Sequence, residues 1–195
     1  MTSIDPLVTA LFVVVAFMTA GLVHSAWLAS AASRALLIPI DGRLRLRGRR
    51  LFGDNKTVRG FVAMPPASAL SFWALASMLE TTAPSVRDRM WPLTPMQFAA
   101  LGLWAGLGFM LGELPNSFAK RQLDIAPGDG ATGSIGSVVS FVVDRFDSIV
   151  GAMAAISLAT PTPWQTWAYV ALVGPVIHLG FSILLFRLGV KARPA

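Results

Sequence analysis

The chain has 195 residues, of which 54% are hydrophobic and only 13% are charged. A soluble domain of this length usually carries about 25% charged residues, so the composition argues against a water-soluble globular protein. The lack of cysteine excludes disulfides and thiolate metal sites, and a net charge of +6 in so apolar a chain is more typical of basic membrane loops than of nucleic-acid binding.

The apolar residues occur in five blocks of roughly the 20 residues needed to cross a hydrocarbon core about 30 Å thick. In chain order, the blocks are Leu7–Ala29, Phe61–Leu79, Thr94–Gly112, Val138–Thr160 and Trp164–Phe186. No stretch between them is long enough for a second globular domain. We therefore predict an all-α, polytopic membrane protein with about five transmembrane helices, forming a single domain over residues 1–195.

The first block is longer than the apolar region of a cleavable signal peptide, and no positive charge precedes it, so we expect it to span the membrane. Eight of the 16 basic residues lie in the loop between the first and second blocks. Two more follow the third block and three follow the fifth, whereas Arg87 and Arg89 of the second loop are offset by Glu80 and Asp88. With five spans, the positive-inside rule places the N-terminus outside and the C-terminus in the cytoplasm.

Two segments of the first loop differ in character. The run Arg43–Arg50 alternates arginine with small or apolar residues, and its simplest role is orientation and contact with anionic lipid, at about 1 kcal/mol per basic residue near the surface. The segment Phe52–Gly60 combines Lys56 and Arg59 with a hydroxyl and an amide between flexible glycines. Lysine recognises phosphate as a point charge and arginine as a fork, so this segment is a candidate phosphate loop.

Two further polar segments lie on the same side of the predicted membrane. Gly112–Arg121 follows the third block at its cytoplasmic end. The glycine-rich stretch Pro127–Ser137 opens onto the fourth block, where backbone N–H groups could cradle phosphate or the stretch could serve as a flexible linker. The convergence of these segments and the phosphate loop on one face favours an active site over scattered loop charges.

The fourth block contains Asp144, Arg145 and Asp147 within an otherwise apolar span. Charges at membrane depth are costly and normally face a bundle interior or an aqueous cavity. Residues three apart share a helix face, so Asp144 and Asp147 can direct their carboxylates into one site, with Ser148 on the same face. Such a pair suits Mg²⁺, which completes its shell with water and substrate phosphates. The alternative is an internal ion pair of Arg145 with an acid, but one arginine cannot neutralise both.

Two histidines, His24 and His178, stand alone in the first and fifth blocks. Isolated histidines of this kind usually hydrogen-bond across helices. The P-loop pattern is absent, and no soluble nucleotide-binding domain is expected.

The segment Ser117–Arg121, followed downstream by Asp144–Ser148, resembles the signature of the phosphatidate cytidylyltransferase (CDP-diacylglycerol synthase) superfamily. The likeness to its archaeal-type branch, the CDP-archaeol synthases, rests on Asn55–Gly60, Glu113–Phe118, Lys120-Arg121, Pro127-Gly128, the short length and the five-helix layout. The Lys-Asp pair and His-Gly-Gly segment of the bacterial diacyl-type signature do not occur here. Asp144–Ser148 is nevertheless closer to the diacyl form, which leaves the lipid open between diacyl and isoprenoid ether chains.

The resemblance implies that a membrane lipid carrying a phosphomonoester attacks the α-phosphorus of CTP, giving a CDP-lipid and pyrophosphate. Asp144 and Asp147 would hold the Mg²⁺ cofactor, and Lys56 and Arg59 would bind the CTP phosphates. The enzyme would lie in the cell membrane with its site facing the cytoplasm. The sequence leaves a homodimer open.

The remaining residues implied by the resemblance bind or support the phosphates. The groups expected to hold the lipid phosphate or pyrophosphate are Lys120 and Arg121. The supporting donors are Asn55, Thr57, Asn116 and Ser117, and Glu113 is expected in the metal shell or near the nucleotide.

Two other functions would also use intramembrane acids. A CDP-alcohol phosphatidyltransferase usually has an Asp-Gly-x-x-Ala-Arg pattern, but Ala-Arg is missing after Asp129-Gly130. A small transporter could couple ions through Asp144 and Asp147, but no pair of broken helices suggests inverted repeats.

Overall fold

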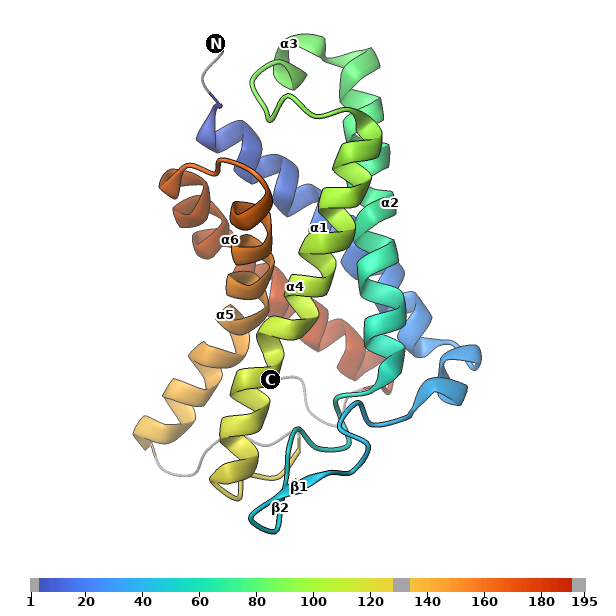
Figure 1. The fold of residues 1–195 in the computed structure, drawn as a ribbon, viewed down its shortest axis with the longest axis vertical. Coiled ribbons are helices and arrows are strands. Elements are labelled where there is room, and N and C mark those ends of the chain that lie inside the picture. The colour runs from blue at the N-terminus through green and yellow to red at the C-terminus, as the bar shows by residue number, and fades with distance from the viewer. Residues whose placement is uncertain (1–3, 128–133, 191–195) are drawn as a thin grey trace.

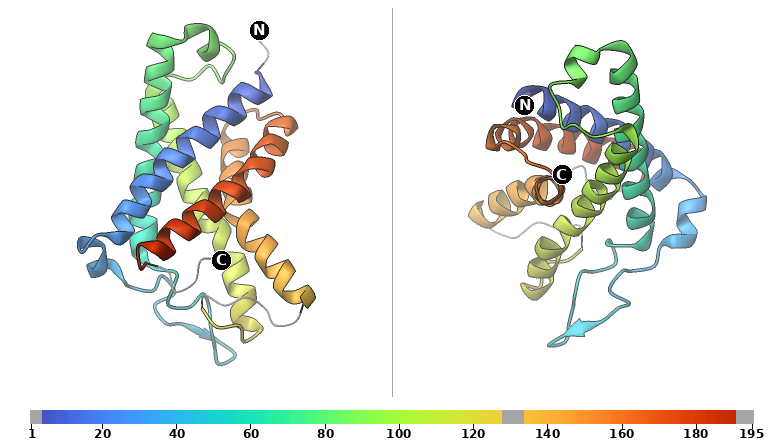
Figure 2. Two further views of the ribbon diagram at one scale, coloured as in Figure 1. Left: turned by 180° about the vertical axis from the view of Figure 1, so that it is seen from behind. Right: turned by 45° about the horizontal axis from the view of Figure 1, so that its top comes forward.

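Five long helices dominate the computed structural model, which describes residues 4–127 and 134–190. The long helices are α1 (Pro6–Ala29), α2 (Val58–Thr82), α4 (Pro95–Gln122), α5 (Ser134–Ala159) and α6 (Trp164–Arg187). The short elements are the 3₁₀ helix Ala32–Leu36, helix α3 (Pro84–Arg87) and the antiparallel strands β1 (Arg45–Leu46) and β2 (Arg49–Arg50). The hairpin lies at one end of the bundle and α3 at the other (Figure 1). Figure 2 shows α1 and α6 side by side, crossing the bundle obliquely.

Local capping signals set where two of the long helices begin. The Asp5 carboxylate accepts hydrogen bonds from the N–H groups of Leu7 and Val8 at 2.9 and 3.1 Å, and a proline follows it where no N–H donor is needed. Thr94 and Gln97 form a reciprocal capping box at the start of α4. These residues satisfy backbone groups that would otherwise lack partners at the helix ends.

Each predicted membrane segment coincides with one long helix, and the largest difference is at the end of α4. The sequence predicts an end at Gly112, whereas α4 continues through Pro115 to Gln122. Proline removes one backbone hydrogen bond but does not end this helix. The extension is stabilised instead by side-chain contacts with α5 and with the loop before α2, because Asn116 and Glu113 bond to both. The polar segment Gly112–Arg121, predicted to follow the helix, is therefore part of it.

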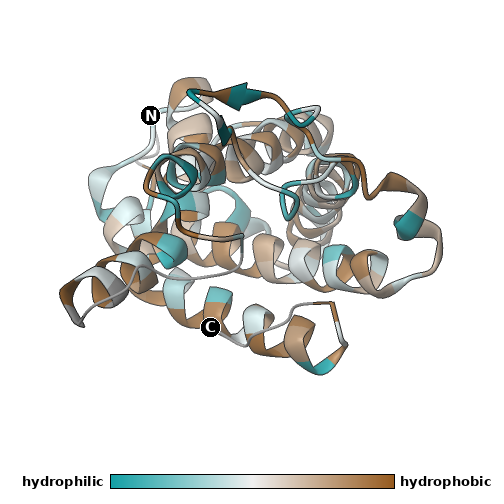
Figure 3. Cartoon of the chain, turned by 90° about the horizontal axis from the view of Figure 1, so that it is seen from below, coloured by the Kyte–Doolittle hydropathy of each residue, from teal (hydrophilic) through white to brown (hydrophobic). Residues whose placement is uncertain are grey.

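The outer surface of the long helices is apolar, as a bilayer requires. Leu172 and Val176 of α6 are 75% and 71% exposed, which is unfavourable in water but favourable in hydrocarbon. Figure 3 shows the two strands in the hydrophilic colour and most helical turns as apolar. Of the described helices, α1, α2, α4 and α6 are long and apolar enough to cross a membrane, whereas the 26-residue α5 carries three charges near its middle. The all-α polytopic class is confirmed, and the number of crossings stays a prediction.

Aromatic and glycine contacts hold the long helices together. The Phe12 ring of α1 lies 5.2 Å from that of Phe72 in α2 and 5.0 Å from that of Phe98 in α4, between centroids. Gly112 of α4 packs against Gly151 of α5 so closely that a side chain at Gly112 would clash with the backbone of α5. This close approach brings polar residues of α4 within hydrogen-bonding reach of α5.

Candidate active site

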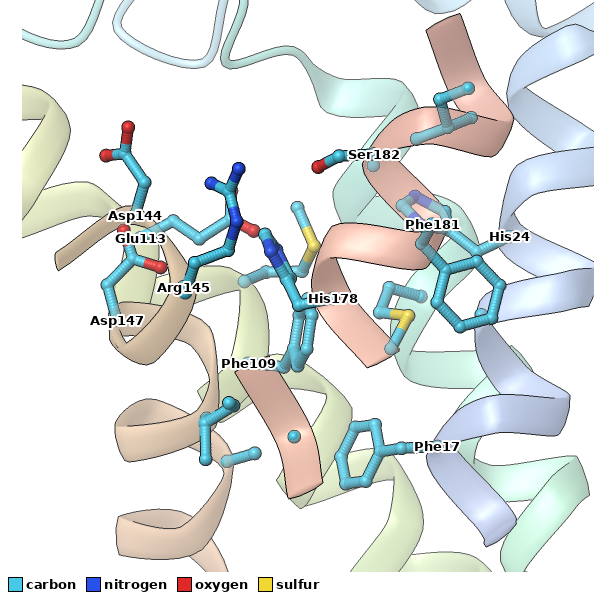
Figure 4. A pocket seen from close by; sticks show the side chains of 18 of the residues that line it. Phe17, His24, Phe109, Glu113, Asp144, Arg145, Asp147, His178, Phe181 and Ser182 are labelled. Atoms are coloured by element: carbon cyan, nitrogen blue, oxygen red, sulfur yellow. The ribbon is translucent and has the colours of Figure 1, made fainter. Parts of the chain in front are cut away.

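A cavity of about 740 Å³ lies between the five long helices and the loop that precedes α2. Its two ends differ chemically, with Phe17 towards one end and Asp144 and Glu113 towards the other (Figure 4). All eleven site residues predicted from the sequence line this cavity. Polar segments that are far apart in the chain are therefore brought to one place.

Helical periodicity sets which side chains of α4 and α5 face each other. Glu113, Asn116, Ser117 and Lys120 recur at the three- and four-residue spacing of a single helix face, which is turned towards α5. On α5, Asp144, Asp147 and Ser148 have the same spacing. In the glycine contact between the helices, Gly112 directly precedes the α4 set and Gly151 follows Ser148 by three residues, so the contact borders both sets.

One side chain of α4 joins the two acids of α5. The Asn116 amide nitrogen donates to an Asp144 oxygen at 2.6 Å and to an Asp147 oxygen at 2.8 Å. The Lys120 ammonium lies 2.6 Å from both Asp144 oxygens. The Asp147 carboxylate also accepts from the backbone N–H of Ser148 at 2.6 Å. The two carboxylates thus face one small volume that already contains cationic and amide donors.

Glu113 connects this cluster to the loop before α2. Its carboxylate forms an ion pair with Lys56 and accepts a hydrogen bond from the Ser148 hydroxyl at 2.9 Å. Lys56 and Glu113 have side chains only 16% and 19% exposed. The pair is therefore poorly screened by water and links the phosphate loop to α4 and, through Ser148, to α5.

A buried aspartate fixes the shape of the segment that leads to the phosphate loop. The side chain of Asp41 accepts hydrogen bonds from the Arg50 guanidinium and from the backbone N–H groups of Arg43, Phe52 and Gly53. Burial opposes ionisation of the Asp41 carboxyl, but these donors outweigh it and lower its pKa to about 2. The carboxylate thus remains charged and keeps the chain before Lys56 folded back on itself.

Two arginines of the run Arg43–Arg50 have acidic partners, whereas the sequence predicted orientation and contact with anionic lipid as the role of this run. Arg50 pairs with Asp41 and Asp54. Arg49 pairs with Asp124 and also donates to the Gln122 carbonyl at the end of α4. These acids are remote in sequence or lie across a turn, so the pairing could not be predicted from the sequence. At least part of the run fastens the hairpin to the polar end of α4.

The cavity also contains residues that were not predicted to serve the site. His24 and His178, expected to bond across helices, both line it, and the His24 Nε2 atom has no hydrogen-bond partner in the described parts of the chain. The His178 ring lies 6.5 Å from that of Phe109. Arg145 lines the cavity as well, and it forms no ion pair with a neighbouring acid among the described residues, which was the alternative that the sequence left open. The sequence does contain a signal for Arg145, because it lies between Asp144 and Asp147 but does not share their helix face.

The two aspartates fit a divalent cation that prefers oxygen ligands. Both direct an oxygen to the same amide nitrogen, so their like charges are held close together. Within residues 4–127 and 134–190, no group of three His, Asp or Glu side chains forms a complete ligand set. A cation at this position would therefore draw its other ligands from water and substrate phosphates, which is the usual arrangement for Mg²⁺. The predicted glycine-rich phosphate cradle lies largely in residues 128–133, outside the described residues.

Comparisons with known proteins point to one family. The model of the CarS-like family, described as CDP-archaeol synthase, matches residues 7–194. The chain is 35% identical to the CDP-archaeol synthase of Halobacterium salinarum, covering 80% of this chain and 82% of that protein. It is 29% identical to the CDP-archaeol synthase of Pyrococcus furiosus, covering 80% and 83%.

A solved structure shares the arrangement of the helices. It is described as an intramembrane enzyme for archaeal membrane lipid biosynthesis, and it matches with a TM-score of 0.61 at 24% identity. The match covers 87% of this chain and 92% of that structure. The likeness is one of fold, over nearly the whole of both chains.

Proposed function

Because the chain belongs to the CDP-archaeol synthase family, we propose that it is a CTP-dependent cytidylyltransferase acting on an archaetidic acid-like membrane lipid. One observation carries the proposal beyond family membership. A single cavity combines a cluster of lysine, arginine and carboxylate groups at one end with apolar walls at the other. Such a space suits the meeting of a polyanionic nucleotide with the phosphate end of a lipid.

The reaction balances as a displacement at phosphorus. An oxygen of the lipid phosphomonoester forms a bond to the α-phosphorus of CTP, and the bond from that phosphorus to the oxygen bridging to the β-phosphorus breaks. CDP-lipid and pyrophosphate result. The nucleophile is already anionic and needs no strong base, so the enzyme's main task is to bring two polyanions together and neutralise their charge.

We assign the charged residues of the cavity to this task. Asp144 and Asp147 would hold a divalent cation, for which Mg²⁺ is our proposal, and the cation would supply charge neutralisation at the phosphates. Lys56 and Arg59 would bind the CTP phosphates, with Lys56 released from Glu113 as the nucleotide enters. Lys120 and Arg121 would hold the lipid phosphate or the departing pyrophosphate. The supporting polar groups are Asn55, Thr57, Glu113, Asn116 and Ser117.

Purified protein is expected to transfer label from α-labelled CTP to a phosphate-bearing isoprenoid ether lipid and to release one pyrophosphate per CDP-lipid. The same lipid without its phosphate is the control and should accept no label. Phosphatidate, offered in competition in mixed micelles, measures the preference between diacyl and ether chains. Absence of labelled lipid with active, folded protein would contradict the proposal. The comparisons give no support to a phosphatidyltransferase or a transporter.

We also propose that the protein spans the plasma membrane and that the polar end of its cavity faces the cytoplasm. The hairpin with its arginines and the end of α4 lie at one end of the bundle, opposite α3 and the start of α1 (Figure 1). Under the positive-inside rule the basic end is cytoplasmic. Topology reporters fused at Arg47 and Asp88 should therefore report inside and outside, respectively. A cytoplasmic signal at Asp88 would overturn this orientation.

A further inference from the structure

Arg145 is a buried cation of the cavity wall that forms no ion pair within the described parts of the chain. Its side chain lies on α5 and is directed into the cavity, between the two aspartates and His178 (Figure 4). The residue is only 6% exposed, and its Nε and Nη2 atoms have no hydrogen-bond partner among the described residues. A buried charge with no partner is strongly unfavourable, and charged groups at membrane depth normally mark a functional site.

The neighbouring acids form no direct contact with Arg145 in the described parts of the chain, because they bond to other donors. Asp144 is bound by Lys120 and Asn116. Asp147 accepts from Asn116 and from the Ser148 backbone. No ion pair between Arg145 and either acid is present in the described parts of the chain. The Nε and Nη2 donors of the guanidinium therefore remain for a group that enters the cavity.

The orientation of the guanidinium suits a phosphate. Its central carbon lies 4.3 Å from the centroid of the Phe141 ring, one helical turn earlier on α5, so one face of the group is covered. The unpartnered Nε and Nη2 atoms share one edge of the planar group. Two parallel N–H donors on that edge match two oxygens of a phosphate, a geometry that lysine cannot reproduce.

We propose that Arg145 binds the phosphomonoester of the lipid substrate through this edge. The inference rests on the proposed cytidylyltransferase function and assigns one substrate within the same cavity. Lys56, which pairs with Glu113, remains for CTP with the loop before α2, and Lys120, which pairs with Asp144, remains for pyrophosphate. Arg145 would hold the attacking phosphate beside the paired aspartates while the lipid chains extend along the apolar walls.

Ligand binding without turnover tests this assignment independently of the reaction. The probes are a short-chain dialkyl glycerol phosphate, the same lipid without its phosphate, and CTP with Mg²⁺, each measured by thermal shift of the detergent-solubilised protein. Arg145→Gln should weaken binding of the phosphate lipid about 10- to 100-fold, the range for a charge-assisted hydrogen bond, and change CTP binding less than about twofold. Arg89→Gln removes the same charge at an exposed position that pairs with Asp5 outside the cavity, and should change neither.

Stability separates a binding role from a structural one. Loss of an unpaired buried charge should leave the ligand-free melting temperature of Arg145→Gln unchanged or higher. If that variant does not fold, Arg145→Lys carries the test, because it keeps the charge but lacks the fork and should bind the phosphate lipid several-fold more weakly. Wild-type affinity for the phosphate lipid in either folded variant overturns the proposal. So does a selective loss of CTP binding, which would assign Arg145 to the nucleotide.

A failed labelling assay would not by itself affect this inference. If wild-type protein binds the phosphate lipid in preference to the dephosphorylated lipid but forms no CDP-lipid, the cytidylyltransferase function fails and the anion site stands. If CDP-lipid is formed and Arg145→Gln keeps the wild-type KM for the lipid, the function stands and the assignment of Arg145 fails.

Discussion

Asp144→Asn and Asp147→Asn are each expected to reduce CDP-lipid formation by a factor on the order of 10³ or more, since a bound metal ion contributes several kcal/mol of charge stabilisation. Asparagine keeps the size of the side chain and its hydrogen-bonding capacity but loses the charge that a divalent cation requires. The two acids already lie close to each other through their shared bonds to Asn116, so each replacement alone should break the site.

The two variants should differ in stability. Asp147→Asn relieves repulsion between neighbouring carboxylates, and we expect its melting temperature to be unchanged or higher. Asp144→Asn leaves the Lys120 ammonium without its carboxylate and should gain no stability. Asp124→Asn is the matched control, because this carboxylate is exposed, pairs with Arg49 on the hairpin and lies outside the cavity.

Metal removal gives the same prediction without a mutation. EDTA should abolish activity of the wild-type protein, and added Mg²⁺ or Mn²⁺ should restore it. Near-normal turnover of both asparagine variants, or activity that persists in EDTA, would show that these acids do not hold a catalytic cation.

Lys56→Ala is expected to lower kcat/KM for CTP by a factor on the order of 10², because it removes a charge-assisted contact to phosphate in a poorly solvated cavity. The effect should be seen mainly as a higher KM for CTP, or as loss of turnover at all accessible CTP concentrations. Arg59→Ala should act in the same direction. Arg47→Gln, an exposed position on the hairpin outside the cavity, should leave CTP kinetics unchanged and affect only membrane insertion or lipid contact.

A double mutant separates nucleotide binding from the ion pair that Lys56 makes with Glu113. Lys56→Ala leaves a poorly exposed carboxylate without its partner, which alone could disturb the site. Adding Glu113→Gln removes that charge. If Lys56 binds CTP, the double variant should remain as defective as Lys56→Ala in kcat/KM. Recovery of activity in the double variant would mean that Lys56 serves only to neutralise Glu113.

The membrane class and the helices could be read from the sequence because they depend on local properties. The length and apolarity of a segment decide whether it can cross a bilayer, and caps such as Asp5 and Thr94 lie next to the helices that they begin. The shared face of Asp144 and Asp147 also follows from helical periodicity alone. Charge asymmetry predicted that three polar segments lie on one side of the membrane. Residues of two of them, Phe52–Gly60 and Gly112–Arg121, line one cavity, and the third lies largely outside the described residues.

Only the tertiary structure decided which of these residues touch. Periodicity gives the face of a helix but not its rotation or axial position against a neighbour, and the Gly112–Gly151 contact sets both for α4 and α5. That register lets Asn116 bridge the two aspartates and brings Glu113 to Lys56, 57 positions away in the chain. In the same register, donors from α4 bond to the two acids beside Arg145. Two of its nitrogen atoms are left without a partner among the described residues, because competition between helices for hydrogen bonds depends on packing and not on sequence spacing.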